Sequence, residues 1–167
     1  MRYPSGTPTQ PEIIAIALSK LDIKPGEVFV DIGCGSGSVS IAAAGLAKRV
    51  FAIESREDAV LATSANIKEC GIKNISVLKG DAEKLLSDID FDCAFIGGSK
   101  NIEQVLEILI KKARVRFVVS AVRVETVALA QEIMKEKQVF RELLQIQYQG
   151  EMSLQAVLCS NPKIPYS

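Results

Sequence analysis

The chain contains no histidine among its 167 residues. Histidine is the side chain that most often acts as a general base near neutral pH, and it is the commonest protein ligand for metal ions. A reaction carried out by this protein must therefore proceed without imidazole, and we predict no bound metal. The cysteines form no C-x-x-C pair, which disfavours a zinc site or a disulfide framework and predicts reduced, mostly buried thiols in a cytoplasmic protein.

The chain also lacks a net charge, a membrane-length apolar run and a signal-peptide pattern. Its 20 Lys and Arg residues balance its 20 Asp and Glu residues, which argues against nucleic acid as the main partner. No apolar stretch approaches the length of a bilayer span, so no membrane partner is expected. Apolar residues make up 48% of the sequence, which is enough for a packed core. The length predicts one domain covering residues 1–167.

The most informative stretch is Val28–Gly37, which reads VFVDIGCGSG. Its apolar beginning predicts a buried strand, and Asp31 interrupts it near the strand's carboxyl end. Three alternating glycines follow, and Ser38 opens an Ala-rich segment typical of a helix. A strand, a glycine turn and a helix in this order make a nucleotide-binding unit.

The glycine spacing distinguishes between cofactors. Dinucleotide sites usually read G-x-G-x-x-G, whereas this turn reads G-x-G-x-G and places Ser38 at the third dinucleotide position. The pattern resembles the first motif of class I S-adenosylmethionine-dependent methyltransferases. Their cofactor has a zwitterionic methionine end and no phosphates. The turn would therefore let the methionine end lie close to the backbone rather than bind an anion. The alternative is a tight strand–helix turn with no ligand.

Three further features follow later strands. Glu54 ends the second predicted strand, where such folds place a carboxylate on a ribose diol; a solvated strand-end glutamate is the alternative. Asp81 follows the third strand and suits either a contact to the adenine or a helix N-cap, and these roles are compatible. Gly97-Gly98-Ser99 follows the fourth strand at the expected substrate cleft, and its glycines indicate close approach to a bulky ligand. An ordinary loop with Ser99 as N-cap is equally compatible.

The periodicities predict a doubly wound, mostly parallel α/β sheet that ends in an antiparallel hairpin. A capping box with Thr9 as N-cap opens the first helix, which runs to about Leu21. The predicted strands are 28–32, 49–53, 75–78, 90–96 and 116–121, the further helices are 39–48, 56–70, 101–112 and 124–137, and the hairpin segments are 139–149 and 152–160.

Four motifs together narrow the resemblance to the CbiT-type decarboxylating cobalt-precorrin methyltransferases of cobalamin biosynthesis, which act at ring carbon 15. They are the entry Gly6–Glu12, the turn Asp31–Ser38, the FIGGS element Phe95–Ser99 and the AVRVET segment Ala121–Thr126. The FIGGS element is the most specific, and the likeness covers about Gly6 to Gln131. The family implies a seven-stranded Rossmann-like sheet, a tetrapyrrole substrate and a homotetramer.

The resemblance also assigns residues. It implies contacts to the S-adenosylmethionine cofactor by a group of residues in the first three β–α units: Thr9, Asp31, Gly33, Cys34, Gly35, Ser36, Gly37, Glu54, Asp81 and Ala82. It implies contacts to the substrate by Gly97, Gly98, Ser99 and Glu125. Cations for the substrate carboxylates could come from Arg56, Lys100, Arg116 or Arg123, although each is more simply read as a solvated charge.

Other functions stay open. A methyltransferase acting on RNA or another small molecule would share the cofactor site, but an Asn/Asp-Pro-Pro-Tyr/Phe element is missing after the fourth strand. A cofactor-binding module without activity is favoured by a final hairpin that looks short for the family. An NAD-dependent dehydrogenase is disfavoured by Ser38 and by the missing acid or base.

Overall fold

The computed structural model of the chain describes residues 1–4, 8–98, 100–112, 114–147 and 154–160. The helices are α1 Pro11–Leu21, α2 Ser38–Ala44, α3 Glu57–Glu69, α4 Ala82–Leu85, the short 3₁₀ helix η1 Leu86–Asp88, α5 Ile102–Lys111 and α6 Val124–Glu136. The strands are β1 Val28–Ile32, β2 Arg49–Glu54, β3 Ile75–Lys79, β4 Cys93–Ile96, β5 Arg116–Ala121, β6 Phe140–Gln147 and β7 Leu154–Ser160.

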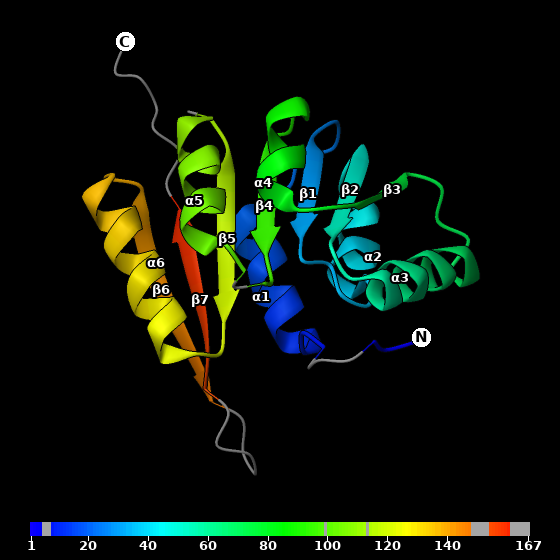
Figure 1. Ribbon diagram of the computed structural model, residues 1–167, viewed down its shortest axis with the longest axis horizontal. Coiled ribbons are helices and arrows are strands. Elements are labelled where there is room, and N and C mark those ends of the chain that lie inside the picture. The colour runs from blue at the N-terminus through cyan, green and yellow to red at the C-terminus, as the bar shows by residue number, and fades with distance from the viewer. Residues whose placement is uncertain (5–7, 99, 113, 148–153, 161–167) are drawn as a thin grey trace.

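The seven strands form one mixed sheet in the order β3-β2-β1-β4-β5-β7-β6 (Figure 1). Strands β1 to β5 pair in parallel, whereas β7 runs antiparallel to both β5 and β6. The predicted doubly wound sheet with a terminal antiparallel hairpin is confirmed. The chain leaves β1 toward β2 on one side and later returns to β4 on the other, so the order reverses between β1 and β4. Ligands in open α/β sheets bind beside such a reversal.

Two apolar clusters cover the two faces of the sheet. Helices α5 and α6 pack on the face to which Val30 points, and α1 and α2 pack on the face to which Phe29 points. Figure 1 shows α5 and α6 in front of the sheet and α1 behind it. Because β1 is buried on both faces, its apolar residues run continuously instead of alternating with polar ones.

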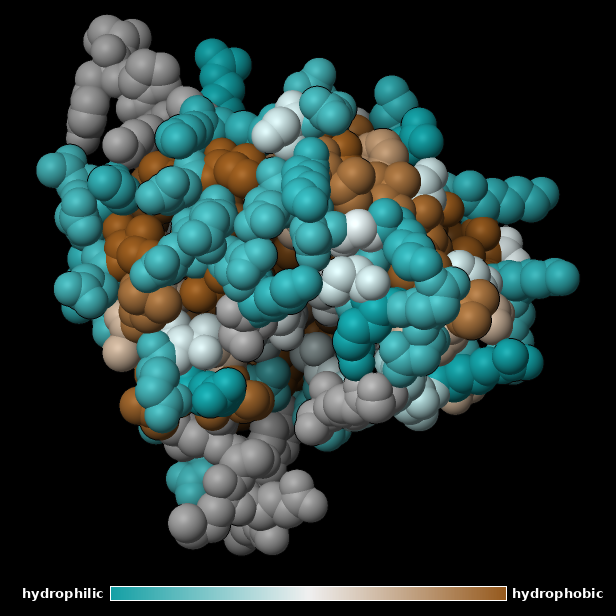
Figure 2. Space-filling model, viewed as in Figure 1, coloured by the Kyte–Doolittle hydropathy of each residue, from teal (hydrophilic) through white to brown (hydrophobic). Residues whose placement is uncertain are grey.

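Polar residues cover the exposed sides of these helices. Figure 2 shows one face of the molecule, on which polar side chains project and apolar ones lie between them. In the part of the chain that the structure describes, no helix has both the length and the apolar character needed to span a bilayer.

The predicted capping box of the first helix is wrong. Helix α1 begins at Pro11 with Gln10 as its N-cap, and the Gln10 side chain makes no capping hydrogen bond. Proline suits the first helical position because its φ is fixed and it has no N–H to satisfy. The residue before a proline favours an extended conformation, and Gln10 adopts it, which moves the cap from Thr9 to Gln10.

Other predicted elements were found with shifted ends. The fourth strand begins at Cys93 rather than Asp90, because Asp92 lies before the strand and its carboxylate accepts a hydrogen bond from Val28 N at 2.8 Å. Helix α2 ends at Ala44, before Gly45, and not at the predicted Lys48. Helix α5 takes Asn101 as its N-cap. The predicted hairpin turn near Gly150 lies outside the described residues.

Candidate functional site

A cavity of about 470 Å³ opens at the carboxyl ends of β1, β2 and β4, where the strand order reverses. This volume lies within the usual range of small-molecule sites, about 300–1,000 Å³. Its walls come from the N-terminal residues, the glycine turn, the end of β2, the β3–α4 loop and the β4–α5 loop. The predicted site residues among its lining are Thr9, Gly33, Cys34, Gly35, Ser36, Glu54, Asp81, Ala82, Gly97 and Gly98.

The glycine-rich turn, residues 33–37, has a backbone that only glycine adopts easily. Gly33, Gly35 and Gly37 all have positive φ angles, between 56° and 80°. A Cβ added at Gly37 would lie 2.8 Å from Cγ2 of Thr63, whereas one at Gly35 would meet nothing within 4 Å. The turn is therefore pressed against the protein at one end and open at Gly35, which lines the cavity.

The two glycines after β4 lie close to the glycine-rich turn, a contact that the sequence did not predict. A Cβ added at Gly33 would lie 3.1 Å from the backbone nitrogen of Gly98, and one at Gly97 would lie 3.0 Å from the Phe95 ring. The sequence predicted close approach to a bulky ligand. The structure shows that the β4–α5 loop approaches the glycine-rich turn itself. Gly97 and Gly98 also line the cavity, so they remain available to a substrate.

Glu54 lies at the end of β2 with its side chain 6% exposed. Its Oε2 atom accepts a hydrogen bond from Gly35 N at 3.1 Å, and its Oε1 atom accepts hydrogen bonds from the backbone nitrogens of Ser55 and Arg56. The Arg56 guanidinium lies 3.4 Å from the same carboxylate and also lines the cavity. The carboxylate is thus held rigidly beside the open face of the glycine-rich turn, as a ribose-binding acid requires.

Asp31 occupies a different place from the other predicted site residues. Its side chain is completely buried beneath the glycine-rich turn and does not line the cavity. Oδ2 accepts a hydrogen bond from Ser40 Oγ at 2.6 Å, and Oδ1 has no hydrogen-bond partner among the described residues. Burial raises the pKa of Asp31 to about 7, and the charge of Glu54 adds to this rise while the hydrogen bonds from Ser40 oppose it. Gly37 likewise lies outside the lining.

The β3–α4 loop and the β4–α5 loop meet through an ion pair. Asp81 is the N-cap residue of α4, but its carboxylate makes no capping hydrogen bond. Its Oδ1 accepts a hydrogen bond from Lys100 Nζ at 2.9 Å, and Lys84 lies 3.8 Å from Oδ2. The hydrogen bond and charge of Lys100 hold the pKa of Asp81 below its usual range. Asp81, Ala82 and Lys100 all line the cavity.

Three polar residues of the site were missed from the sequence. Thr63 and Asn66 lie on the buried face of α3, where they donate hydrogen bonds to Gly35 O and Ser36 O, and Ser40 on α2 holds Asp31. All three are at most 1% exposed. The available signal was a threonine and an asparagine at helical spacing among the apolar residues of 57–69, since buried polar groups need specific partners.

Three other residues that the sequence proposed for the substrate site lie outside the cavity. Glu125 is exposed in the first turn of α6 and does not line it. Arg116 begins β5, at the opposite edge of the sheet, and pairs with Glu27. Arg123 is the exposed N-cap of α6 and is not among the lining residues either. Ser99 lies outside the described residues.

The three buried thiols are poorly suited to nucleophilic chemistry. Burial raises the pKa of Cys34, Cys93 and Cys159, to about 12 for Cys93 and about 11 for Cys159. Cys70 is exposed, and all four cysteines are free. The prediction of mostly buried, unpaired thiols is confirmed. Cys34 therefore contributes its backbone and shape to the cavity rather than a thiolate.

The donor set fits an S-adenosylmethionine-like ligand better than a dinucleotide. Glu54 and Asp81 place carboxylates in the cavity wall, and Asp31 lies buried behind it. The carboxylates of Glu54 and Asp81 would repel a pyrophosphate, but they can accept hydrogen bonds from a ribose and an adenine amino group and favour a cationic sulfonium. The open backbone at Gly35 leaves room for close approach of the ligand.

Comparison with known proteins agrees with this geometry. A family model described as a precorrin methyltransferase domain matches residues 4–166. A Methanosarcina acetivorans protein named probable cobalt-precorrin-6B C(15)-methyltransferase (decarboxylating) is 51% identical over 148 residues, which cover 85% of this chain and 80% of that protein.

Two solved structures are also similar. The precorrin-6y C5,15-methyltransferase of Geobacter metallireducens has a TM-score of 0.86 at 27% identity, covering 95% of this chain and 92% of its own. The precorrin 8w decarboxylase of Methanobacterium thermoautotrophicum has a TM-score of 0.83 at 27% identity, covering 95% and 93%. The likeness therefore includes the terminal hairpin as well as the cofactor half.

Proposed function

This chain belongs to the precorrin methyltransferase family, and from that premise we propose that it methylates carbon 15 of a cobalt-precorrin in cobalamin biosynthesis and decarboxylates the acetate at carbon 12. S-adenosylmethionine is the methyl donor. The single observation that carries the proposal is the cavity at the β1/β4 reversal, which joins the glycine-rich turn, Glu54 and the Gly97-Gly98 loop in one wall.

Each wall of the cavity has a part in this proposal. Glu54 accepts the two ribose hydroxyls, and Asp81 with Ala82 holds the adenine. The glycine-rich turn and Thr9 take the methionine end. Support comes from the positions of these residues, since all of them line one cavity of nucleoside size. Asp31 acts from behind the turn, where its buried carboxyl accepts a hydrogen bond from Ser40 Oγ and holds α2 against the end of β1.

Methyl transfer and decarboxylation require little from the protein beyond the correct positioning of the cofactor and the substrate. Bound S-adenosylmethionine supplies an electrophilic methyl group on a sulfonium. The electron-rich ring carbon of the substrate would accept this methyl group, and the sulfur would keep the electron pair of the broken carbon–sulfur bond, which gives S-adenosylhomocysteine as the product. Loss of carbon dioxide from the acetate leaves an electron pair that the macrocycle can take up. The cavity walls hold the reactants in line and exclude water, so the absence of histidine is no obstacle.

The substrate lies at the mouth of the cavity, against Gly97 and Gly98. Its acetate and propionate groups require cations, and of the four candidates only Arg56 and Lys100 are found in the described lining. Lys100 is 69% exposed, follows Gly97 and Gly98 in the β4–α5 loop, and pairs with Asp81 at 2.9 Å. We assign Lys100 to a substrate carboxylate.

A cytoplasmic location and a homotetrameric assembly complete the proposal. The free cysteines are compatible with a reducing compartment. The tetramer comes from the family resemblance, and light scattering coupled to gel filtration would test it. Two alternatives are a methyltransferase for RNA or another small molecule and an inactive cofactor-binding module. An assay of methyl transfer to a cobalt-precorrin distinguishes both from the proposed activity.

Calorimetric titration tests the cofactor site directly. S-adenosylmethionine should bind and NAD should not. Substitution Glu54→Ala should weaken S-adenosylmethionine binding by about 10- to 100-fold, since it removes charge-assisted hydrogen bonds. Asp92→Ala is the matched control, because Asp92 also accepts a backbone hydrogen bond but lies at the opposite edge of the sheet. Binding that is absent, or equally affected by both substitutions, would contradict the assignment of the cavity.

A further inference from the structure

Helix α3 carries two buried polar side chains, one helical turn apart, that hold the glycine-rich turn. Thr63 Oγ1 donates a hydrogen bond to Gly35 O at 2.7 Å, and Asn66 Nδ2 donates to Ser36 O at 2.8 Å. These are consecutive carbonyls of the turn. A helix therefore fixes the turn from outside, in addition to the bonds within the β1–α2 unit.

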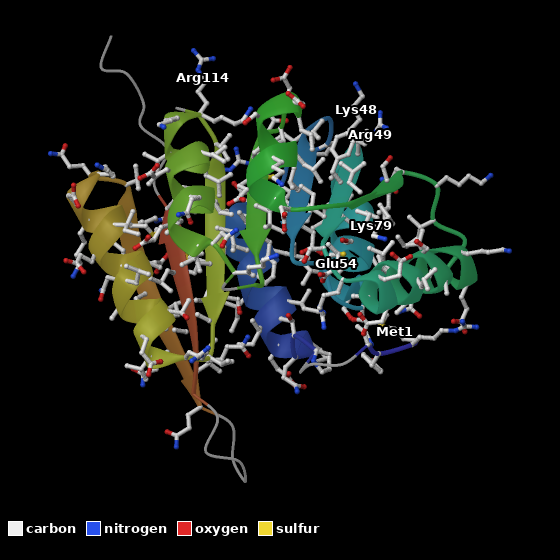
Figure 3. All side chains as sticks on the ribbon, viewed as in Figure 1. Met1, Lys48, Arg49, Glu54, Lys79 and Arg114 are labelled. Atoms are coloured by element: carbon white, nitrogen blue, oxygen red, sulfur yellow. The ribbon has the colours of Figure 1, made fainter. Side chains whose placement is uncertain are left out.

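Asn66 makes a second connection, to the N-terminal strap, residues 1–4. The Arg2 backbone nitrogen donates a hydrogen bond to Asn66 Oδ1 at 2.6 Å, and Asn66 Nδ2 donates to Arg2 O at 2.8 Å. Ser38 Oγ also donates to the Met1 sulfur at 3.3 Å. Figure 3 shows Met1 at the edge of the molecule near Glu54, whereas Lys48, Arg49 and Arg114 lie at the opposite edge.

The N-terminal strap is part of the cavity wall. Tyr3 and Pro4 line the cavity, as does Ser36 of the glycine-rich turn. Asn66 is 1% exposed and its amide uses both of its donor hydrogens and its oxygen. One side chain thus sets the distance between two walls of the cavity that are more than 30 residues apart in sequence.

We propose that Asn66 is a positioning residue for cofactor binding: it holds the N-terminal strap against the glycine-rich turn, so that Tyr3 and Pro4 close the cavity over the bound cofactor. An aliphatic residue in its place would leave two backbone carbonyls and one backbone N–H without their partner. The strap would then detach, and the cofactor would escape more readily while the carboxylates of the opposite wall stayed in place. This inference rests on the proposed function, because it assumes S-adenosylmethionine as the ligand.

The test is the affinity and dissociation rate of S-adenosylmethionine for Asn66→Ala. We expect the Kd to rise by about tenfold, mainly through faster dissociation, as the loss of a buried hydrogen-bonded clamp implies. Asn74→Ala is the matched control: Asn74 Nδ2 also donates to two backbone carbonyls, of Ala44 and Ala47, but Asn74 does not line the cavity. It should lose thermal stability and keep its Kd.

A second variant, Tyr3→Ala, distinguishes a loss of cofactor affinity from a general loss of folding stability. Tyr3 is 61% exposed, so Tyr3→Ala should leave the melting temperature unchanged and still raise the Kd. Combined with Asn66→Ala, it should add little further, because the strap is already released.

The outcomes separate the inference from the proposed function. Wild-type protein that does not bind S-adenosylmethionine would overturn both. Three results would overturn only the role of Asn66, provided that the wild type binds S-adenosylmethionine. They are an unchanged Kd in Asn66→Ala or in Tyr3→Ala, an equal loss of affinity in Asn74→Ala, and full additivity of the Asn66→Ala and Tyr3→Ala effects on the Kd.

Discussion

At the scale of single residues, Asp31 has the clearest pH dependence. Its pKa in the folded protein is about 7, against an ordinary value of 3.8, because it is buried. Between these two values the folded protein holds a proton that the unfolded chain has released. The free energy of unfolding should therefore fall as pH rises through this window, by up to about 1.4 kcal/mol per pH unit, and the contribution levels off above it.

Substitution Asp31→Asn removes this titration and keeps an oxygen that can accept the Ser40 hydrogen bond. Urea unfolding of both proteins from pH 4.5 to 8 measures the difference. The stability of Asp31→Asn relative to the wild type should increase with pH. Parallel pH profiles for the two proteins would show that Asp31 is not protonated in the folded state.

Lys100 gives a prediction about the substrate. Lys100→Met should raise the KM for the tetrapyrrole by about 3- to 10-fold, the size expected for one exposed ion pair. The Kd for S-adenosylmethionine should change less, because Lys100 reaches the cofactor only through its hydrogen bond to Asp81. Lys84→Met is the control, since Lys84 also lies near Asp81 but does not line the cavity. Steady-state kinetics with both variants would decide this. An equal KM increase for Lys84→Met would indicate a general effect of charge.

Single residues also show what the sequence could reveal. Glu54 and Asp81 were predictable because each follows a recognisable strand, and the strand ends of a parallel sheet meet at one edge. Thr63 and Asn66 had only a weak signal, their helical spacing, because a threonine and an asparagine in a helix look like ordinary surface residues until the turn that they hold is in place. Glu125 was assigned from the resemblance alone, and the structure leaves it outside the cavity.

At the scale of elements, the contact between the glycine-rich turn and the β4–α5 loop is the point most sensitive to change. Gly33→Ala adds a Cβ 3.1 Å from Gly98 N at a φ of +74°, so one of the two backbones must move. We expect lower stability, by about 1–3 kcal/mol, and at least tenfold weaker binding of S-adenosylmethionine. Thermal unfolding and calorimetry measure the two effects.

Gly26→Ala is the control that has backbone strain but no contact with the β4–α5 loop. Gly26 has a φ of +102°, yet a Cβ there would meet nothing within 4 Å. This variant should lose stability and keep its affinity for the cofactor. If Gly33→Ala behaved in the same way, the contact with Gly98 would have no part in shaping the cavity.

Element types were predictable where local patterns are strong, and element ends were less so. The apolar run of 28–32 and the alternating glycines after it predict a strand and a turn without any tertiary information, and the structure has both, with positive φ at the glycines. The start of α1 depended on the choice between Thr9 and Gln10 as the cap, which Pro11 decided. The start of β4 depended on Asp92 bonding to Val28, a partner 64 residues away that local sequence does not show.

At the scale of the whole molecule, the sheet order explains why residues from four loops meet in one cavity. Glu54, Asp81 and Gly98 follow different strands, and parallel pairing brings the carboxyl ends of β1, β2, β3 and β4 to one edge. The antiparallel β7 and β6 extend the sheet beyond β5 and away from this cavity. The sequence resemblance predicted this arrangement, but periodicity alone did not determine the direction of β7.

The protein should transfer a methyl group to a tetrapyrrole and release carbon dioxide from it. The most direct test is to incubate the purified protein with methyl-labelled S-adenosylmethionine and cobalt-precorrin-6B, and to analyse the product by mass spectrometry and NMR. We predict one labelled methyl group on carbon 15 and the release of one carbon dioxide per turnover. Protein that binds S-adenosylmethionine but transfers no label to the tetrapyrrole would contradict the claim.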